Sequence, residues 1–116
     1  MGFWEDLARA IGADAIDTSP QAIVRYGANR LPGGDRPPSG VVYPGSTGDV
    51  RAIVAAAARH GMTLWPTSTG RNAGLGELSP VREGQAVVHL GARMNAIVEL
   101  DETLAYCVLE PGVTFH

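Results

Sequence analysis

Two short apolar runs flank one well-marked helical segment, and this arrangement constrains the fold more than any other part of the chain. The segment "STGDVRAIVAAAARHG" begins with Ser46 three residues before Asp49, a capping-box pattern, and it ends near Gly61. The apolar residues that follow helical spacing are Val50, Ile53, Val54 and Ala57. The runs on either side, "VVYP" and Met62–Trp65, predict strands. A strand, a helix and a strand in this order predict a parallel, right-handed crossover.

A glycine-rich polar loop, "TSTGRNAGLG", follows the second run directly. Its glycines at 70, 74 and 76 match neither the Walker spacing nor the G-x-G-x-x-G of a Rossmann turn. Glycine still lets backbone amides approach an anion closely, and successive amides can form a concave nest around phosphate oxygens. The end of a parallel strand is also where open α/β sheets bind ligands. On composition alone two interpretations stay open: a pyrophosphate-binding loop, or a long turn with Arg71 in solvent.

The rest of the chain predicts an N-terminal helical arm and a strand-rich second half. Apolar residues at helical spacing predict a helix from Phe3 to Ile11, and Ser19 followed by a proline predicts a second one through about Arg25. The stretch "LPGGDRPPSG" is an irregular connection, so we expect an arm at 1–38 and a main body at 39–116. The runs "AVVHL", "AIVEL" and "TLAYCVLE" predict strands, the last two joined by a tight turn at Asp101 and Glu102.

Composition excludes several classes of function. The formal net charge of −3 leaves no basic surface for a nucleic acid, and no apolar run reaches membrane-spanning length. Cys107 is the only cysteine, so no disulfide framework forms and we expect a reducing, cytoplasmic location. We expect Cys107 to act as a small buried hydrophobe.

No residue pattern predicts a metal site or a catalytic residue. His60 lies at the end of the helix predicted from Ser46 to near Gly61, where a positive charge interacts favourably with the helix dipole. His89 lies in the predicted strand "AVVHL". Neither shares a metal-ligand spacing with another histidine. Asp101 and Glu102 have no partner acid at a defined spacing, so we assign no general acid or base.

The segments "VVYPGSTGDVRAIVAAAARHG", "WPTSTGRNAGLGELSP" and "MNAIVELDETLAYCVLEPGVTF" together resemble the vanillyl-alcohol oxidase and p-cresol methylhydroxylase type of FAD-binding flavoproteins. The resemblance runs from about Ser39 to Phe115. It implies an α+β fold of the PCMH type, in which this chain is the N-terminal subdomain: a βαβ unit followed by short strands. Because members of the family are several times longer, we expect the chain to be a truncated part of such a domain.

The resemblance also implies a cofactor and its site. The cofactor is FAD, and the residues implied to bind it are Thr67, Ser68, Thr69, Gly70, Arg71, Asn72, Gly74 and Gly76. Some relatives in the wider superfamily carry a histidine that links covalently to the flavin, and here the comparable position is Asn72. Any covalent tether would therefore come from outside this chain. The "EPGVT" segment resembles a strand-to-helix turn shaped by Pro111 and Gly112.

The implied function is that of a flavin-dependent oxidoreductase acting on para-substituted phenols or aromatic alcohols. A small aromatic substrate, and either a second copy or a cytochrome, would be partners of the complete protein. The 116 residues alone carry no predicted catalytic group. Two alternatives stay open: a nucleotide- or pyrophosphate-binding module without redox activity, and a non-functional truncated fragment.

Overall fold

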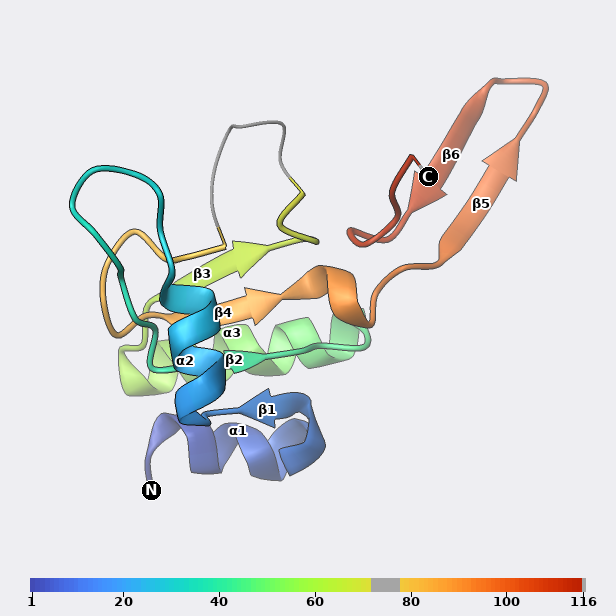
Figure 1. Cartoon of the computed structure of the whole chain (residues 1–116). Helices are drawn as coiled ribbons and strands as arrows, with labels where there is room; N and C mark the ends of the chain where they lie inside the picture. Colours follow the sequence, from blue (N-terminus) through green and yellow to red (C-terminus); the bar gives the residue numbers. More distant parts are fainter. Residues whose placement is uncertain (72–77, 116) are drawn as a thin grey trace.

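The computed structural model describes residues 1–71 and 78–115. The fold is α+β, with a four-stranded sheet, three α-helices and a separate two-stranded hairpin among the described residues (Figure 1). The elements are α1 (Phe3–Ile11), η1 (Ala13–Ala15), β1 (Ile16–Asp17), α2 (Pro20–Gly27), β2 (Gly40–Val42), α3 (Thr47–His60), β3 (Leu64–Thr67), β4 (Ala86–His89), η2 (Leu90–Ala92), β5 (Ile97–Asp101) and β6 (Tyr106–Leu109).

The sheet has the order β1-β2-β4-β3, and it contains the predicted strand-helix-strand unit. Strands β2 and β3 both run parallel to β4, which lies between them. The two strands that α3 connects, β2 and β3, are therefore not neighbours in the sheet. The strand between them is β4, which comes later in the sequence. The short strand β1 was not predicted; it pairs antiparallel with β2 and forms one edge.

Local chemistry sets the ends of the predicted helices. Gly12 ends α1 with φ of 97°, in the region that favours glycine. The hydroxyl of Ser19 accepts a hydrogen bond from the Ala22 amide at 3.2 Å, and α2 extends to Gly27, two residues beyond the predicted end. The hydroxyl of Ser46 accepts from the Asp49 amide at 3.1 Å and caps α3. The Asp49 carboxylate accepts a hydrogen bond from the amide of Gly45. In a capping box the donor would be the amide of the N-cap residue itself, Ser46.

The core has one layer on each face of the sheet. Alternate residues of β2 and β4 point to opposite faces, as the pleat requires. On one face, Val42 and Val88 pack with α1 and α3 in a cluster that includes Phe3, Leu7 and Ile53. On the other face lie Val41, Val87, Ala22 and Tyr26, the last two from α2. Residues 1–38 thus contribute helices to both layers of the core, and the boundary at residue 38 stays a prediction.

The hairpin of β5 and β6 extends away from the sheet (Figure 1). Its turn differs from the predicted one, because Asp101 still pairs with Tyr106 as the last residue of β5. Residues 102–105 make the turn: the Asp101 carboxylate accepts from the Leu104 amide at 2.8 Å, and Ala105 has φ of 54°. Cys107 is exposed on β6, so the expectation of a buried thiol was wrong: all four residues of β6 are exposed, and in the described chain this strand pairs only with β5.

The apolar side chains of the hairpin are exposed in this chain. They are Ile97, Val98, Leu100, Leu104, Tyr106, Val108 and Leu109. Within residues 1–71 and 78–115, no helix is long and apolar enough to cross a membrane.

Candidate functional site

The predicted phosphate-binding loop begins at the carboxyl end of β3. Thr67, the last residue of β3, is buried and lies opposite His89 of β4. Gly70 has φ of 75°, and a Cβ at this position would touch the side chain of Leu78. The glycine is therefore required both by its backbone conformation and by its neighbour. The predicted site residues Asn72, Gly74 and Gly76 lie outside the described residues.

A pocket of about 240 Å³ opens beside the start of this loop. One wall comes from Ser68, Thr69 and Arg71, and the other from residues 113–115, which follow β6. The chain after β6 turns back toward the end of β3 (Figure 1). The pocket therefore combines two hydroxyl groups and a guanidinium group with a second segment more than 40 positions further along the chain. Among the described residues, Arg71 has no recorded ion pair, so its charge is available to an anion.

Three backbone segments, from the chain after β3, from η2 and from the chain after β6, come into close contact next to this pocket. The amide of Gly91, in η2, donates to the carbonyl oxygen of Ser68 at 3.0 Å. The amide of Gly112 donates to the carbonyl oxygen of Met94 at 2.7 Å. A Cβ on Gly112 would lie 2.5 Å from the carbonyl oxygen of Gly91, so only glycine allows these segments to come so close. Sequence reasoning named Gly112 as shaping the chain but missed Gly91, which no local motif marks.

A polar cluster of aromatic side chains lies beside the same edge of the sheet. The hydroxyl of Tyr43 donates to that of Tyr26 at 3.2 Å, and Tyr26 in turn lies 2.7 Å from Nδ1 of His89. Burial, and then the nearby charge of Arg25, lower the pKa of His89, so its ring is neutral at pH 7. Burial and the hydrogen bond with Tyr43 raise the pKa of Tyr26, which keeps its proton. The Tyr26 hydroxyl and the imidazole are therefore both neutral at pH 7 and share a hydrogen bond at Nδ1.

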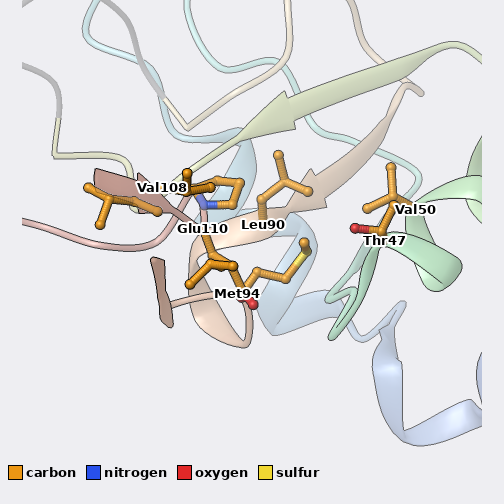
Figure 2. Close-up of a pocket in the computed structure, with 9 residues that line it drawn as sticks. Thr47, Val50, Leu90, Met94, Val108 and Glu110 are labelled. Atoms are coloured by element: carbon orange, nitrogen blue, oxygen red, sulfur yellow. The ribbon is translucent and has the colours of Figure 1, made fainter. Parts of the chain in front are cut away.

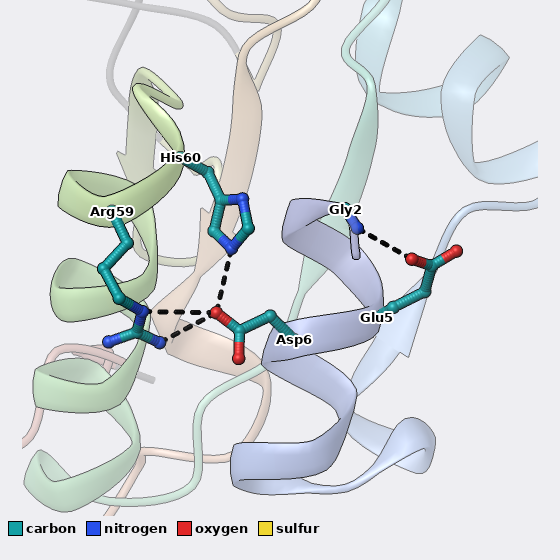
Figure 3. Close-up of polar contacts among 5 residues, drawn as sticks. All are labelled: Gly2, Glu5, Asp6, Arg59 and His60. Atoms are coloured by element: carbon teal, nitrogen blue, oxygen red, sulfur yellow. Dashed lines mark hydrogen bonds and ion pairs between the residues drawn. The ribbon is translucent and has the colours of Figure 1, made fainter.

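His60 joins two helices instead of acting only on the end of its own helix. Its Nε2 lies 2.9 Å from the carboxylate of Asp6 in α1, and Arg59 donates to the same oxygen at 2.9 Å (Figure 3). The hydrogen bonds from Arg59 and then His60 lower the pKa of Asp6. In the described part of the chain, no three His, Cys, Asp or Glu side chains gather as a metal site would require.

An apolar pocket of about 430 Å³ lies between α3, η2 and the hairpin. Figure 2 shows Thr47 and Val50 of α3 on one side and Val108 on the other, with Leu90 and Met94 between them. Glu110 is the one charged residue in its lining. This pocket has little to hold a polar ligand, so the loop pocket is the stronger candidate site.

The chain belongs to the FAD-binding domain family. A family profile described as "FAD binding domain" matches residues 38–116. The fold and the relatives place the chain more narrowly, as the N-terminal part of a PCMH-type FAD-binding domain of the vanillyl-alcohol oxidase and p-cresol methylhydroxylase family. The cofactor of this family is FAD, as the sequence predicted.

The curated relatives that match the sequence include the following two. A 1'-carboxy-chondrochloren decarboxylase from Chondromyces crocatus is 47% identical over 76 residues, which are 66% of this chain and 14% of the relative. The flavoprotein subunit of 4-cresol dehydrogenase from Pseudomonas putida is 33% identical over 107 residues, 90% of this chain and 20% of the relative.

Two solved structures share the fold closely. A 4-ethylphenol oxidase from Gulosibacter chungangensis superposes with a TM-score of 0.87 at 37% identity, over 96% of this chain and 22% of that one. A substrate-bound p-cresol methylhydroxylase superposes with a TM-score of 0.89 at 30% identity, over 97% of this chain and 22% of that one. The chain thus spans about a fifth of the length of these solved relatives.

The described residues fit a group that carries phosphates. Ser68 and Thr69 offer hydroxyl donors at the pocket, and Arg71 offers a charge that pairs well with phosphate oxygens. Gly70 holds a left-handed conformation of the kind found in anion-binding nests. No carboxylate lines the pocket in the described part of the chain, so nothing there repels an anion.

Proposed function

We propose that the loop from Thr67 to Gly76 binds the diphosphate of FAD. The backbone of Ser68, Thr69, Gly70, Arg71 and Asn72 would face the phosphate oxygens, and Gly74 and Gly76 would permit the tight path of the chain. The observation that carries this proposal is the polar pocket at the carboxyl end of β3, in a chain of an FAD-binding family. Each hydrogen bond to a charged group contributes about 1.5 to 3 kcal/mol. Four or five such bonds support micromolar binding even after the loop is ordered.

We further propose that the complete protein is an FAD-dependent oxidoreductase of para-substituted phenols or aromatic alcohols. Support comes from the similarity to a 4-cresol dehydrogenase and a 4-ethylphenol oxidase. Accepting a hydride is the chemistry that FAD supplies when bound. The residues described here bind and orient the cofactor, and the substrate-contacting groups would lie in other parts of the complete protein.

The partners of the complete protein are part of the same proposal. The 4-cresol dehydrogenase relative is named as a flavoprotein subunit, which favours a second subunit such as a cytochrome, and a homodimer is the alternative. We propose a cytoplasmic location, in keeping with the single exposed thiol of Cys107. Mass measurement of the native assembly and cell fractionation test these two points.

A decarboxylase is the second candidate function. The relative with 47% identity carries that name, and its similarity covers the loop region that the proposal uses. An assay of the purified protein with para-alkylphenols and with carboxylated aromatic compounds separates the two functions. Hydrogen transfer without release of CO₂ supports the oxidoreductase, whereas release of CO₂ from the carboxylated compounds supports the decarboxylase.

The substitution Gly70→Val tests the binding site. Valine cannot adopt the φ of 75° without strain, and its side chain would collide with Leu78. We expect FAD affinity to fall by at least about tenfold, since left-handed strain alone amounts to roughly 1–2 kcal/mol. Titration of the apoprotein with FAD measures the affinity, and far-ultraviolet circular dichroism checks that the helices remain.

Gly84→Val is the matched control. Gly84 has φ of 80° but no atom within 4 Å of its Cβ position, and it lies in the turn before β4, away from the loop. We expect this variant to lose some stability and to keep its FAD affinity. Equal FAD affinity in the Gly70→Val variant and the unmodified protein would refute the assignment of the loop.

A further inference from the structure

We propose that Gly91 and Gly112 are positioning residues for the FAD site, because their backbone crossing holds the two walls of the loop pocket at a fixed distance. Neither residue lines the pocket itself. The inference rests on the proposed assignment of the loop to the FAD diphosphate.

The first wall is held through Gly91. Its amide donates to the Ser68 carbonyl oxygen at 3.0 Å, and Ser68 and Thr69 are the first two residues of that wall. A Cβ on Gly91 would lie against the Ser68 carbonyl and 2.9 Å from Cγ2 of Thr69. Real side chains do not tolerate such contacts with backbone, so a larger residue must push the loop away from η2.

The second wall is held through Gly112. Its amide donates to the Met94 carbonyl oxygen at 2.7 Å, and the next residue, Val113, begins the wall formed by 113–115. A Cβ on Gly112 would lie 2.5 Å from the Gly91 carbonyl oxygen and 2.7 Å from that of Met94. The segment after β6 therefore rests on the same short helix, η2, that supports the loop.

The backbone angles at positions 91 and 112 do not explain why glycine is needed there. Gly91 and Gly112 both lie outside the left-handed region, so alanine could adopt their backbone angles without strain. Only the close approach of Ser68, Gly91 and Gly112 excludes a side chain. The crossing thereby sets the separation of the two walls, and a shift of about 1 Å is enough to spoil the geometry of a preorganised site.

The experiment compares Gly91→Ala and Gly112→Ala with two alanine controls in the purified protein after removal of flavin. Gly40→Ala is matched for crowding, since its Cβ would lie 2.8 Å from side-chain atoms of Thr18 and Trp4. Gly40 is the first residue of β2, at the amino end of the parallel strands, whereas the loop follows the carboxyl end of β3. Gly48→Ala is matched for the chemical change alone, because its nearest neighbour is 3.5 Å away. Each variant is titrated with FAD and with riboflavin, which lacks the diphosphate, and its melting temperature is measured.

The expected result is a loss of FAD affinity of about tenfold or more in both positioning variants, with riboflavin binding changed by less than about twofold. Gly40→Ala should lower the melting temperature and leave FAD affinity unchanged, and Gly48→Ala should change neither. Unchanged FAD affinity in Gly91→Ala and Gly112→Ala would overturn the inference, and so would an equal loss in Gly40→Ala. If Gly91→Ala and Gly112→Ala keep FAD affinity while Gly70→Val loses it, the positioning role of the two glycines is refuted and the loop assignment stands. If Gly70→Val also keeps FAD affinity, the assignment of the loop to the FAD diphosphate is refuted as well.

Hydrogen exchange of the unmodified protein tests the same inference without any variant. The amides of Gly91 and Gly112 should exchange more slowly once FAD is added, because the ligand holds both walls against η2. If the positioning variants do not fold, the hydrogen-exchange measurement on the unmodified protein tests the inference by itself. Unaltered exchange at both amides on addition of FAD overturns the inference.

Discussion

His89 lies in a partly buried cluster with two tyrosines, and its Nδ1 is hydrogen-bonded to the hydroxyl group of one of them. The Tyr26 hydroxyl lies 2.7 Å from Nδ1, and the hydroxyl of Tyr43 donates to that of Tyr26. Burial and Arg25 lower the pKa of His89 below its ordinary value of 6.5. The folded protein therefore resists protonation of this ring, whereas the unfolded chain accepts a proton at the ordinary pKa.

This difference predicts a pH-dependent stability. As the pH falls through 6.5 toward the lowered pKa, the unfolded chain binds a proton that the folded protein does not, so the free energy of unfolding decreases. The substitution His89→Gln keeps an acceptor for Tyr26 and removes the titration. We expect its urea midpoint to change less than that of the unmodified protein between about pH 7.5 and about pH 5.5. An identical change in both proteins would contradict the prediction.

At the level of single residues, the sequence marked Gly70 and Arg71, because glycine and arginine after an apolar run are typical of anion binding. Their contact with a phosphate stays a prediction, and the structure adds that Gly70 has a left-handed conformation. Gly91 did not stand out. Its role depends on Ser68, which lies 23 positions away along the chain and contacts it only after β3 and β4 have paired.

At the level of elements, helix ends were the most predictable features. Ser19, Ser46 and Gly61 act where the patterns placed them, because a cap depends on neighbours within four residues. The position of β4 between β2 and β3 could not be predicted, since pairing of distant strands leaves no local pattern. The two-residue strand β1 is too short to produce one.

The cap of α3 provides the prediction at this scale. Ser46→Ala removes the hydroxyl that accepts from the Asp49 amide, and we expect a loss of about 1 kcal/mol in the free energy of unfolding. Ser46→Gly should lose only a few tenths of a kcal/mol, because glycine is itself a tolerated N-cap. Urea denaturation followed by circular dichroism measures both variants. An unchanged free energy of unfolding in Ser46→Ala would show that the hydroxyl bond does not stabilise α3.

At the level of the whole molecule, the hairpin carries more than half of the exposed large apolar side chains in the described part of the chain. Leu100 and Leu104 are 68% and 71% exposed, and they belong to the group of exposed apolar residues on β5, β6 and the turn that joins them. Extended apolar patches of this kind drive association in water. We therefore expect the 116-residue chain, prepared by itself, to associate as its concentration rises.

Paired substitutions on the hairpin test this expectation. The double variant Leu100→Ser and Leu104→Ser should associate less, as measured by light scattering on a sizing column. Val24→Ser is the matched control, because Val24 is 72% exposed but lies on α2, outside the hairpin patch. Equal association of the double variant and the unmodified chain would show that another surface is responsible.

The order of the sheet also has a consequence for biosynthesis. A ribosome delivers β2, α3 and β3 before β4, yet β2 and β3 each pair with β4 and not with each other. The nascent chain therefore holds β3 unpaired, and β2 paired only with the two-residue strand β1, until residue 89 has left the exit tunnel. Chaperones that recognise extended apolar segments have this interval in which to bind, and translation speed across residues 68–85 sets its length.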